Sequence, residues 1–175
     1  MLISVLRASY GFAKLFRNKS TNNYKAGNRI YLTILRLRDP DIEEKLPDYG
    51  TSIRVLGLIK FKTRNGWSET ESAILDSGAP ISVIPFDIWQ NAETEILTNY
   101  ELTGIVPRRE CKLPVLIGRI RCILLDKLGN MSKEMRFRAF LALTNQVPLV
   151  LGFKDLLENF NVCFDCKKDR SFIQE

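Results

Sequence analysis

One short stretch constrains this chain more than any other. Residues 73–75 are apolar, Asp76, Ser77 and Gly78 follow them, and a second, largely apolar run then ends at Pro85. Short apolar runs of this kind are typical of buried strands. A glycine beside the acid permits a tight turn and the close approach of another backbone. The pattern therefore predicts a carboxylate held in a loop between two buried strands, a position where the surroundings control its chemistry.

The composition removes several competing chemistries. The 175 residues include no histidine, which excludes Ser-His-Asp and Cys-His catalysis and His-Glu-x-x-His zinc sites. No Gly-x-x-x-x-Gly-Lys-Ser/Thr phosphate loop is present. With 45% hydrophobic and 26% charged residues, the chain belongs to the ordinary globular class. Its length suits one domain. No apolar run reaches the roughly 18 to 20 residues of a membrane span.

Without histidine or a phosphate loop, the hydrolytic chemistries that remain use carboxylates.

The stretch around Asp76 resembles the active-site loop of aspartic proteases, Asp-Thr/Ser-Gly-Ala, and looks most like the retropepsin (retroviral-type) branch. A second segment supports the resemblance, because residues 148–152 read Pro-Leu-Val-Leu-Gly and a predicted short helix follows them. The similarity runs from about Ser52 to the C-terminus. It implies a mainly β fold, a closed acid-protease barrel lobe with about two short helices, in a domain spanning residues 29–175.

The resemblance also implies a mechanism and a set of site residues. Retropepsins hydrolyse peptide bonds with two carboxylates that share one proton, so that one activates water while the other polarises the scissile carbonyl. This chain has a single Asp-Ser-Gly, which implies a homodimer in which the Asp76 residues of two subunits meet. Ser77 would hydrogen-bond across the dimer, Gly78 would allow close approach to substrate, and Ala79 would form a small wall. Gly104, Ile105 and Val106 lie where the family places its substrate-covering flap.

Two positions depart from the retroviral pattern. Retroviral members commonly carry an arginine after the late glycine, and it pairs with an acid four residues after the catalytic aspartate. Here those positions hold Phe153 and Pro80. Both ends of the ion pair are missing together, which indicates a replaced contact and favours a non-viral member of the family.

The positive charge is concentrated at the N-terminal end. The first 38 residues contain eight lysines and arginines and no aspartate or glutamate, whereas the net charge of the whole chain is +6. We interpret residues 1–28 as a basic extension or linker. An amphipathic helix, a transit peptide, a membrane-surface or nucleic-acid arm and a poorly ordered tail all remain open. We expect no nucleic-acid partner for the domain itself.

Hydrophobic periodicity and turn residues predict the order of elements. A loop is expected at residues 39–50, a hairpin turn at Asn65-Gly66 and another turn at Gly129-Asn130. The predicted helices are residues 86–97 and 153–160. The predicted strands are residues 29–38, 52–63, 67–75, 100–106, 114–126, 134–144, 162–164 and 171–173.

The cysteines give a weaker signal. Cys163 and Cys166 have the spacing of a redox or zinc motif, and Cys111 with Cys122 would complete four thiolates. With no histidine and no second close pair, we expect no metal and no cofactor. Four cysteines without a secretory signal favour a reducing, intracellular and cytoplasmic setting, with organelle targeting by the N-terminus left open.

The sequence thus predicts an aspartic endopeptidase that acts on peptide or protein substrates as a homodimer. The alternative is a retropepsin-like dimerisation or binding module with little or no turnover.

Overall fold

The structure of the chain is a computed structural model that describes residues 28–103 and 112–175. Within these residues the fold is mainly β, as the sequence predicts, with two short α-helices and two 3-10 turns. The helices are α1 (Pro40–Lys45) and α2 (Phe86–Trp89), and the 3-10 turns are η1 (Pro47–Tyr49) and η3 (Leu157–Asn159). The strands are β1 (Arg29–Tyr31), β2 (Thr33–Arg38), β3 (Thr51–Thr63), β4 (Gly66–Trp67), β5 (Glu71–Leu75), β6 (Ser82–Ile84), β7 (Thr94–Thr103), β8 (Lys112–Leu125), β9 (Met135–Ala142), β10 (Val150–Leu151), β11 (Asn161–Asp165) and β12 (Arg170–Gln174).

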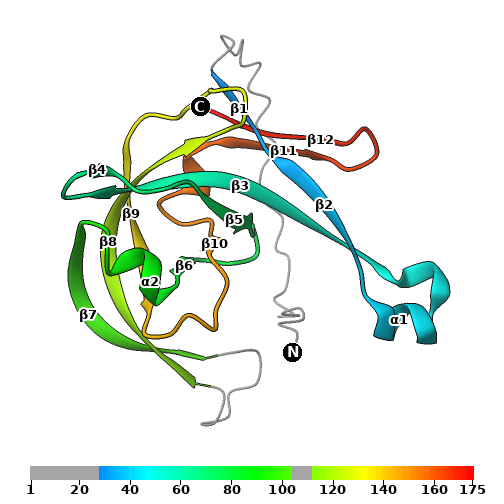
Figure 1. The fold of residues 1–175 in the computed structure, drawn as a ribbon, viewed down its shortest axis with the longest axis horizontal. Helices are drawn as coiled ribbons and strands as arrows, with labels where there is room; N and C mark the ends of the chain where they lie inside the picture. The colour runs from blue at the N-terminus through cyan, green and yellow to red at the C-terminus, as the bar shows by residue number, and fades with distance from the viewer. Residues whose placement is uncertain (1–27, 104–111) are drawn as a thin grey trace, which may run out of the picture.

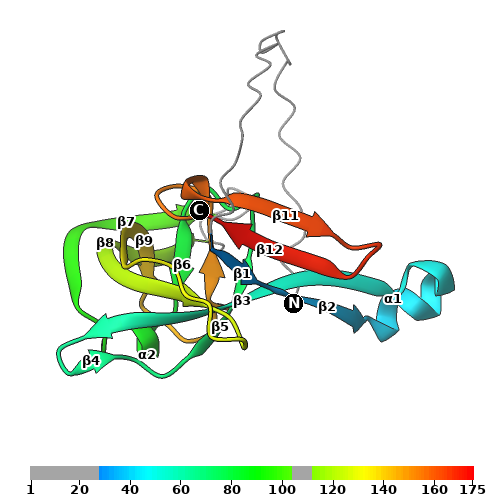
Figure 2. The same ribbon diagram turned by 90° about the horizontal axis from the view of Figure 1, so that it is seen from above.

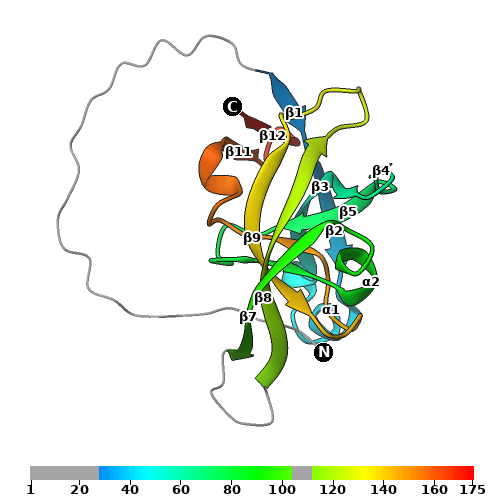
Figure 3. The same ribbon diagram turned by 90° about the vertical axis from the view of Figure 1, so that its left-hand side faces the viewer.

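The strands form two sheets. The larger has the order β2-β3-β5-β10-β6-β9-β8-β7, with β4 attached to β3. The far part of β3 also pairs with β8, from Leu58 opposite Leu125 to Phe61 opposite Cys122, so the pairings run in a ring. The smaller sheet has the order β1-β12-β11 and lies beside β3 in Figure 1. Figure 3 shows β7, β8 and β9, which are part of the larger sheet, running side by side.

The main core lies inside this ring of strands. Its fully buried side chains come from both sheets and include Phe61 of β3, Phe137 of β9 and Ile173 of β12. Burial of such side chains is the principal stabilising term of a domain of this size. The small sheet therefore belongs to the same hydrophobic core as the large one.

The predicted hairpin after β3 is confirmed. Thr63 pairs with Gly66, and Gly66 adopts φ +124°, a conformation that favours glycine. The returning strand, predicted as residues 67–75, is divided into β4 and β5. The division falls at Ser68, whose hydroxyl accepts a hydrogen bond from the Phe61 amide (3.0 Å) and so takes the place of a backbone acceptor.

Two predictions in the N-terminal part were wrong in detail. The strand expected at residues 29–38 is two strands, because β1 pairs with β12 while β2 pairs with β3. The loop expected at residues 39–50 contains α1 and η1. Asp39 caps α1, since its Oδ1 accepts hydrogen bonds from the amides of Asp41 (3.1 Å) and Ile42 (3.2 Å). Pro40 occupies the first turn, where proline is well tolerated.

Both predicted helices are shorter than expected. Residues 86–97 form a helix only as far as Trp89, because from Thr94 onward the chain pairs with β8 as strand β7. Trp89 is buried and its indole Nε1 donates to the Ala142 carbonyl (2.7 Å). Residues 153–160 contain only the 3-10 turn η3, and Asp155 before it has φ +62°. A left-handed residue of this kind interrupts an α-helix.

The strands predicted at residues 52–63, 114–126, 134–144, 162–164 and 171–173 are confirmed to within a few residues as β3, β8, β9, β11 and β12. Of the strand predicted at residues 100–106, residues 100–103 belong to β7, which begins earlier than expected, and residues 104–106 lie outside the described residues. The turn at Gly129-Asn130 is also present, with Gly129 at φ +90°. Among the described residues, no helix has the length and apolar character that crossing a membrane demands.

Candidate active site

Asp76 follows β5 directly, and β10 fixes its backbone. The Asp76 amide donates to the Leu151 carbonyl (3.0 Å), and the Ile74 amide donates to the Leu149 carbonyl (2.9 Å). β10 lies between β5, with which it is parallel, and β6, with which it is antiparallel. The strand before the loop and the strand after it are therefore both hydrogen-bonded to the same third strand. The two sequence segments that carry the retropepsin resemblance are neighbours in the structure.

The Asp76 carboxylate is exposed at the end of β5. Its Oδ1 accepts a hydrogen bond from the Gly78 amide (2.8 Å), and the Asp76 carbonyl accepts one from the Ala79 amide (3.1 Å). A Cβ at residue 78 would lie 3.2 Å from Asp76 Oδ1. Glycine at this position thus leaves room for the carboxylate and its hydrogen bond.

Ser77 is exposed next to the carboxylate. In the described part of the chain, its hydroxyl makes no hydrogen bond. The predicted contact of Ser77 with a second subunit stays a prediction, and the hydroxyl is available for it.

Gly152 lets two backbones touch. A Cβ there would lie 2.5 Å from the carbonyl carbon of Ile81 and 2.7 Å from the amide nitrogen of Ser82. The Gly152 amide donates to the hydroxyl of Ser82 (2.9 Å), and this hydroxyl is fully buried. Because the clash would be with backbone, a larger residue at 152 would displace the segment that follows Asp76.

Main-chain hydrogen bonds replace the ion pair that the sequence lacks. The Phe153 amide donates to the Ala79 carbonyl (2.8 Å), and the Lys154 amide donates to the Pro80 carbonyl (2.9 Å). Phe153 and Pro80 occupy the two positions of the missing ion pair. The segments that carry them therefore contact each other through the main chain and not through charged side chains.

A second contact, which no sequence pattern indicated, also holds this segment. Arg138 of β9 binds Asp155 with two hydrogen bonds, Nε to Oδ2 (2.5 Å) and Nη2 to Oδ1 (3.1 Å). The hydrogen bonds from Arg138 lower the pKa of Asp155 against the opposing effect of burial. The pair anchors the turn after Gly152 to the sheet, and a planar guanidinium suits this two-point contact.

Several other aspartates of the chain are engaged away from the Asp76 loop. Asp126 binds the amides of Tyr31, Leu128 and Asn130, Asp165 pairs with Arg170, and Asp169 pairs with Arg36. Among the described residues, no hydrogen bond or ion pair of Asp126, Asp155, Asp165 or Asp169 involves residues 76–80. A second carboxylate for Asp76 is therefore not supplied by these four residues of the same chain.

A second apolar cluster adjoins the loop. It consists of the buried residues Val115, Phe140 and Ala142, and half-buried apolar side chains pack against it: Ile81, Val83, Leu102, Leu113, Ile117 and Val147. A shallow pocket of about 500 Å³ beside it is lined in part by Tyr100, Val115 and Leu143. Tyr100 stacks on Phe140 with ring centroids 5.4 Å apart. Apolar surface of this kind suits the side chains of an extended peptide.

The predicted flap residues lie outside the described residues. The paired strands β7 and β8 lead to them, and the register continues to Thr103 opposite Lys112. Gly104, Ile105 and Val106 fall between these two residues, so their predicted substrate contacts stay predictions.

A larger hollow of about 880 Å³ lies at the turn between β3 and β4, away from the strands that hold Asp76. Three of the four arginines that line it are already paired: Arg121 contacts Glu93 and Glu134, and Arg119 and Arg136 both contact Glu95. The hollow is therefore a network of ion pairs, and we assign it no ligand.

The cysteines form no ligand group in the described residues, where no cluster of three or more potential metal ligands occurs. Cys122 is buried, and burial raises the pKa of its thiol, which disfavours the thiolate that binds metals. Cys163 lies on β11, and Cys166 lies in the turn after it. The absence of a metal or cofactor stays a prediction.

No protein-family model matches this chain, and no curated protein matches it. The function is therefore inferred from the geometry around Asp76.

Proposed function

We propose that this protein is an aspartic endopeptidase of the retropepsin-like class, active as a homodimer. In this proposal Asp76 of each subunit meets its counterpart, and the pair holds one proton. One carboxylate takes a proton from water while the other donates a hydrogen bond to the scissile carbonyl.

A single observation carries the proposal. Residues 148–152 are the second segment that resembles the retropepsins, and they contain β10, the strand that holds the Asp76 loop. The Asp76 and Gly152 regions contact through the Leu151 carbonyl and the Ser82 hydroxyl. A chance Asp-Ser-Gly in a surface turn would not require this partner.

The ring of pairings through β3 and β8 supports the closed barrel lobe that the class implies. The exposure of Asp76 supports the dimer, because an isolated carboxylate in water lacks the second group that the chemistry needs. The shallow pocket lined in part by Tyr100, Val115 and Leu143 supports an extended peptide as substrate.

The first test is Asp76→Asn. Asparagine has nearly the same shape and cannot ionise, so we expect the fold to persist and peptide hydrolysis to fall by about a hundredfold to ten-thousandfold. The readout is cleavage of a peptide library by purified protein, with and without a pepstatin-type inhibitor, and circular dichroism reports the fold.

Asp87→Asn is the matched control, since Asp87 is another exposed aspartate, on α2, outside the loop. It should retain full activity. Hydrolysis by Asp76→Asn at the wild-type rate would contradict the assignment. A folded wild-type dimer that cleaves no peptide would favour the alternative, a retropepsin-like dimerisation or binding module.

A further inference from the structure

The structure contains a projecting feature that the proposed active site does not use. Residues 33–55, here called the arm, comprise β2, α1, η1 and the first part of β3. The arm leaves the body as a two-stranded ribbon with α1 at its end (Figures 1 and 2). None of its apolar residues belongs to either core cluster of the described residues.

The end of the arm exposes large apolar side chains. The exposed fraction is 57% for Leu46, 75% for Tyr49 and 38% for Ile42, and α1 has no buried residue. Ile53, within the ribbon, is 49% exposed. A two-stranded ribbon without a packed face is marginally stable in water. Apolar side chains gathered at its tip are typical of an interaction surface.

The position of the arm indicates what covers it. In Figures 1 and 2 the arm leaves the body on the side toward which β5 ends, and β5 delivers Asp76. If two copies of Asp76 are to meet, the second subunit must lie on that side. Its surface then faces the arm.

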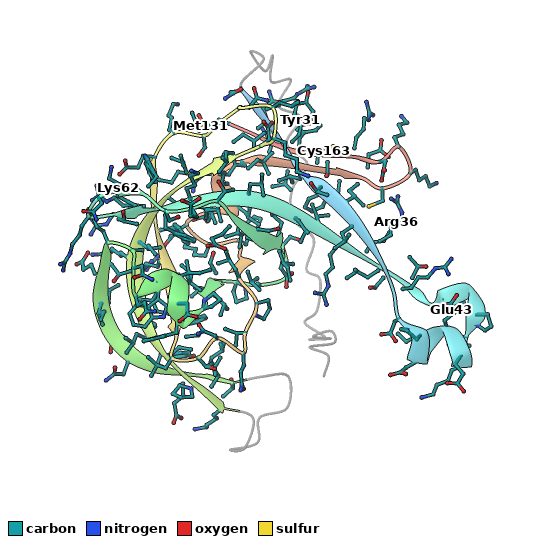
Figure 4. All side chains as sticks on the ribbon, in the orientation of Figure 1. Tyr31, Arg36, Glu43, Lys62, Met131 and Cys163 are labelled. Carbon is teal, nitrogen blue, oxygen red and sulfur yellow. The ribbon has the colours of Figure 1, made fainter. Side chains whose placement is uncertain are left out.

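The ribbon of the arm is fixed to the C-terminal hairpin partway along its length. Arg36, which lies opposite Ile53 in the ribbon, donates through Nη1 to Asp169 (2.7 Å) and through Nη2 to the Cys166 carbonyl (2.9 Å). Figure 4 shows Arg36 on β2 close to this hairpin, whereas Glu43 lies at the far end of the arm. The contact of Arg36 with the hairpin therefore fixes the direction of the ribbon.

The tip of the arm and the rest of the described residues carry opposite net charges. Of the net charge of +6, five units belong to residues 1–27 and one to residues 104–111, so the described residues are neutral overall. The tip, residues 39–50, has five carboxylates and one lysine and is thus −4, which leaves +4 for the rest of the described residues. Among the tip side chains that the structure describes, Glu43 makes an ion pair with Arg38 at 4.0 Å. An acidic tip held away from its own basic body suits the body of a second copy.

We infer that the arm clasps the second subunit of the dimer. Leu46 and Tyr49 of each arm pack on the partner subunit, and the acidic tip faces basic surface there. Twofold symmetry makes the contact twice. This inference rests on the proposed function, because the same dimer brings the two Asp76 residues together.

The test truncates the tip with Leu46→Ala and Tyr49→Ala together. Both side chains are exposed, so the fold of the single chain should be unaffected. We expect the dimer dissociation constant, measured by sedimentation velocity over a concentration series, to rise about tenfold or more. The matched control is Leu128→Ala with Met131→Ala, which removes two equally exposed apolar side chains near the turn after β8. It should leave the constant within about twofold of wild type.

The outcomes separate the two proposals. A wild-type dimer whose affinity is unchanged by the tip variant overturns the clasp and leaves the protease proposal intact. An unchanged dimer with a raised KM for peptide assigns the arm to substrate and also overturns the clasp. A wild-type chain that is monomeric at every concentration overturns the clasp and the dimer together, and peptide hydrolysis by that monomer then decides the protease proposal.

A second measurement on the wild-type protein does not depend on the folding of a variant. If the acidic tip meets basic surface, the dimer should weaken as salt concentration rises, because salt screens exposed charges. An affinity independent of salt between low and high ionic strength would contradict the charge contact.

Discussion

Asp126 shows how one buried carboxylate joins distant parts of this chain. It is 5% exposed and accepts hydrogen bonds from the amides of Tyr31 (3.0 Å), Leu128 (2.8 Å) and Asn130 (3.0 Å) and from the Asn130 side chain (2.8 Å). Burial alone would raise the pKa of Asp126, but the four hydrogen bonds outweigh it and the pKa is lowered from its ordinary value of 3.8. Asp126 thus links β1 to the turn between β8 and β9.

We expect Asp126→Asn to lower the free energy of unfolding by about 1 to 3 kcal/mol, because an amide group places donors where the carboxylate accepts. The measurement is urea denaturation near neutral pH. Asp169→Asn is the control: Asp169 is largely exposed in its ion pair with Arg36, and asparagine tolerates its left-handed backbone (φ +56°).

The lowered pKa also gives a pH dependence. Because the folded protein holds the Asp126 carboxylate in its charged form, the contribution is complete above the unfolded value and is lost as pH falls through the lower folded value. Wild type should therefore lose stability below about pH 4 more steeply than Asp126→Asn. Parallel curves for the two proteins would contradict this role.

At the scale of the element, the C-terminal strand has two neighbours and a place in the core. β12 lies between β1 and β11, and its Ile173 is fully buried in the main cluster. Because Ile173 is part of the main core, loss of β12 would harm the fold of the single chain. Both edges of β12 are occupied within the chain, which leaves β11 as the terminal-hairpin strand for a dimer contact.

Deleting residues 170–175 should therefore lower the free energy of unfolding by about 2 to 5 kcal/mol or more, the scale of removing a fully buried large apolar side chain. Thermal and urea unfolding at one fixed protein concentration measure the loss. Removing Glu175 alone is the control, because β12 ends at Gln174 and remains whole. Wild-type stability of the longer deletion would show that β12 is peripheral.

At the scale of the whole molecule, activity and assembly should be linked. One chain supplies one aspartate in the Asp-Ser-Gly context, so the monomer should be inactive, and the rate per chain should fall on dilution as dimers dissociate. The experiment compares specific activity with the dimer fraction from light scattering over the same concentration range. Hydrolysis strictly proportional to concentration by a monomeric species would refute the shared site.

A chain beginning at Asn28 should behave in the same way. Residues 1–27 hold five of the six net positive charges, and the first strand begins at Arg29. We expect the shortened chain to fold and to hydrolyse peptide at the rate of the full chain. If it is insoluble, the basic segment belongs to the fold.

Local patterns in the sequence were enough for much of this fold. Alternating apolar residues predicted β3, β8 and β9, and Asn65-Gly66 predicted the hairpin, because a strand's side chains alternate and φ > 0 turns select glycine. The Asp76 loop and the Gly152 segment were also found locally, since each has small and apolar residues in a fixed order.

Tertiary structure decided the rest. The chain from Thr94 onward is strand because β8 offers backbone hydrogen bonds along it, and the helical spacing of residues 86–97 does not reveal that partner. The Ser82 hydroxyl under Gly152, the clamp between Arg138 and Asp155, and Asp126 beneath Tyr31 each join residues far apart in the chain. The residues of Asp76's loop can be predicted from local sequence, because they set the local turn. The contacts that hold the loop in place join residues far apart in the chain, and no short sequence pattern reveals them.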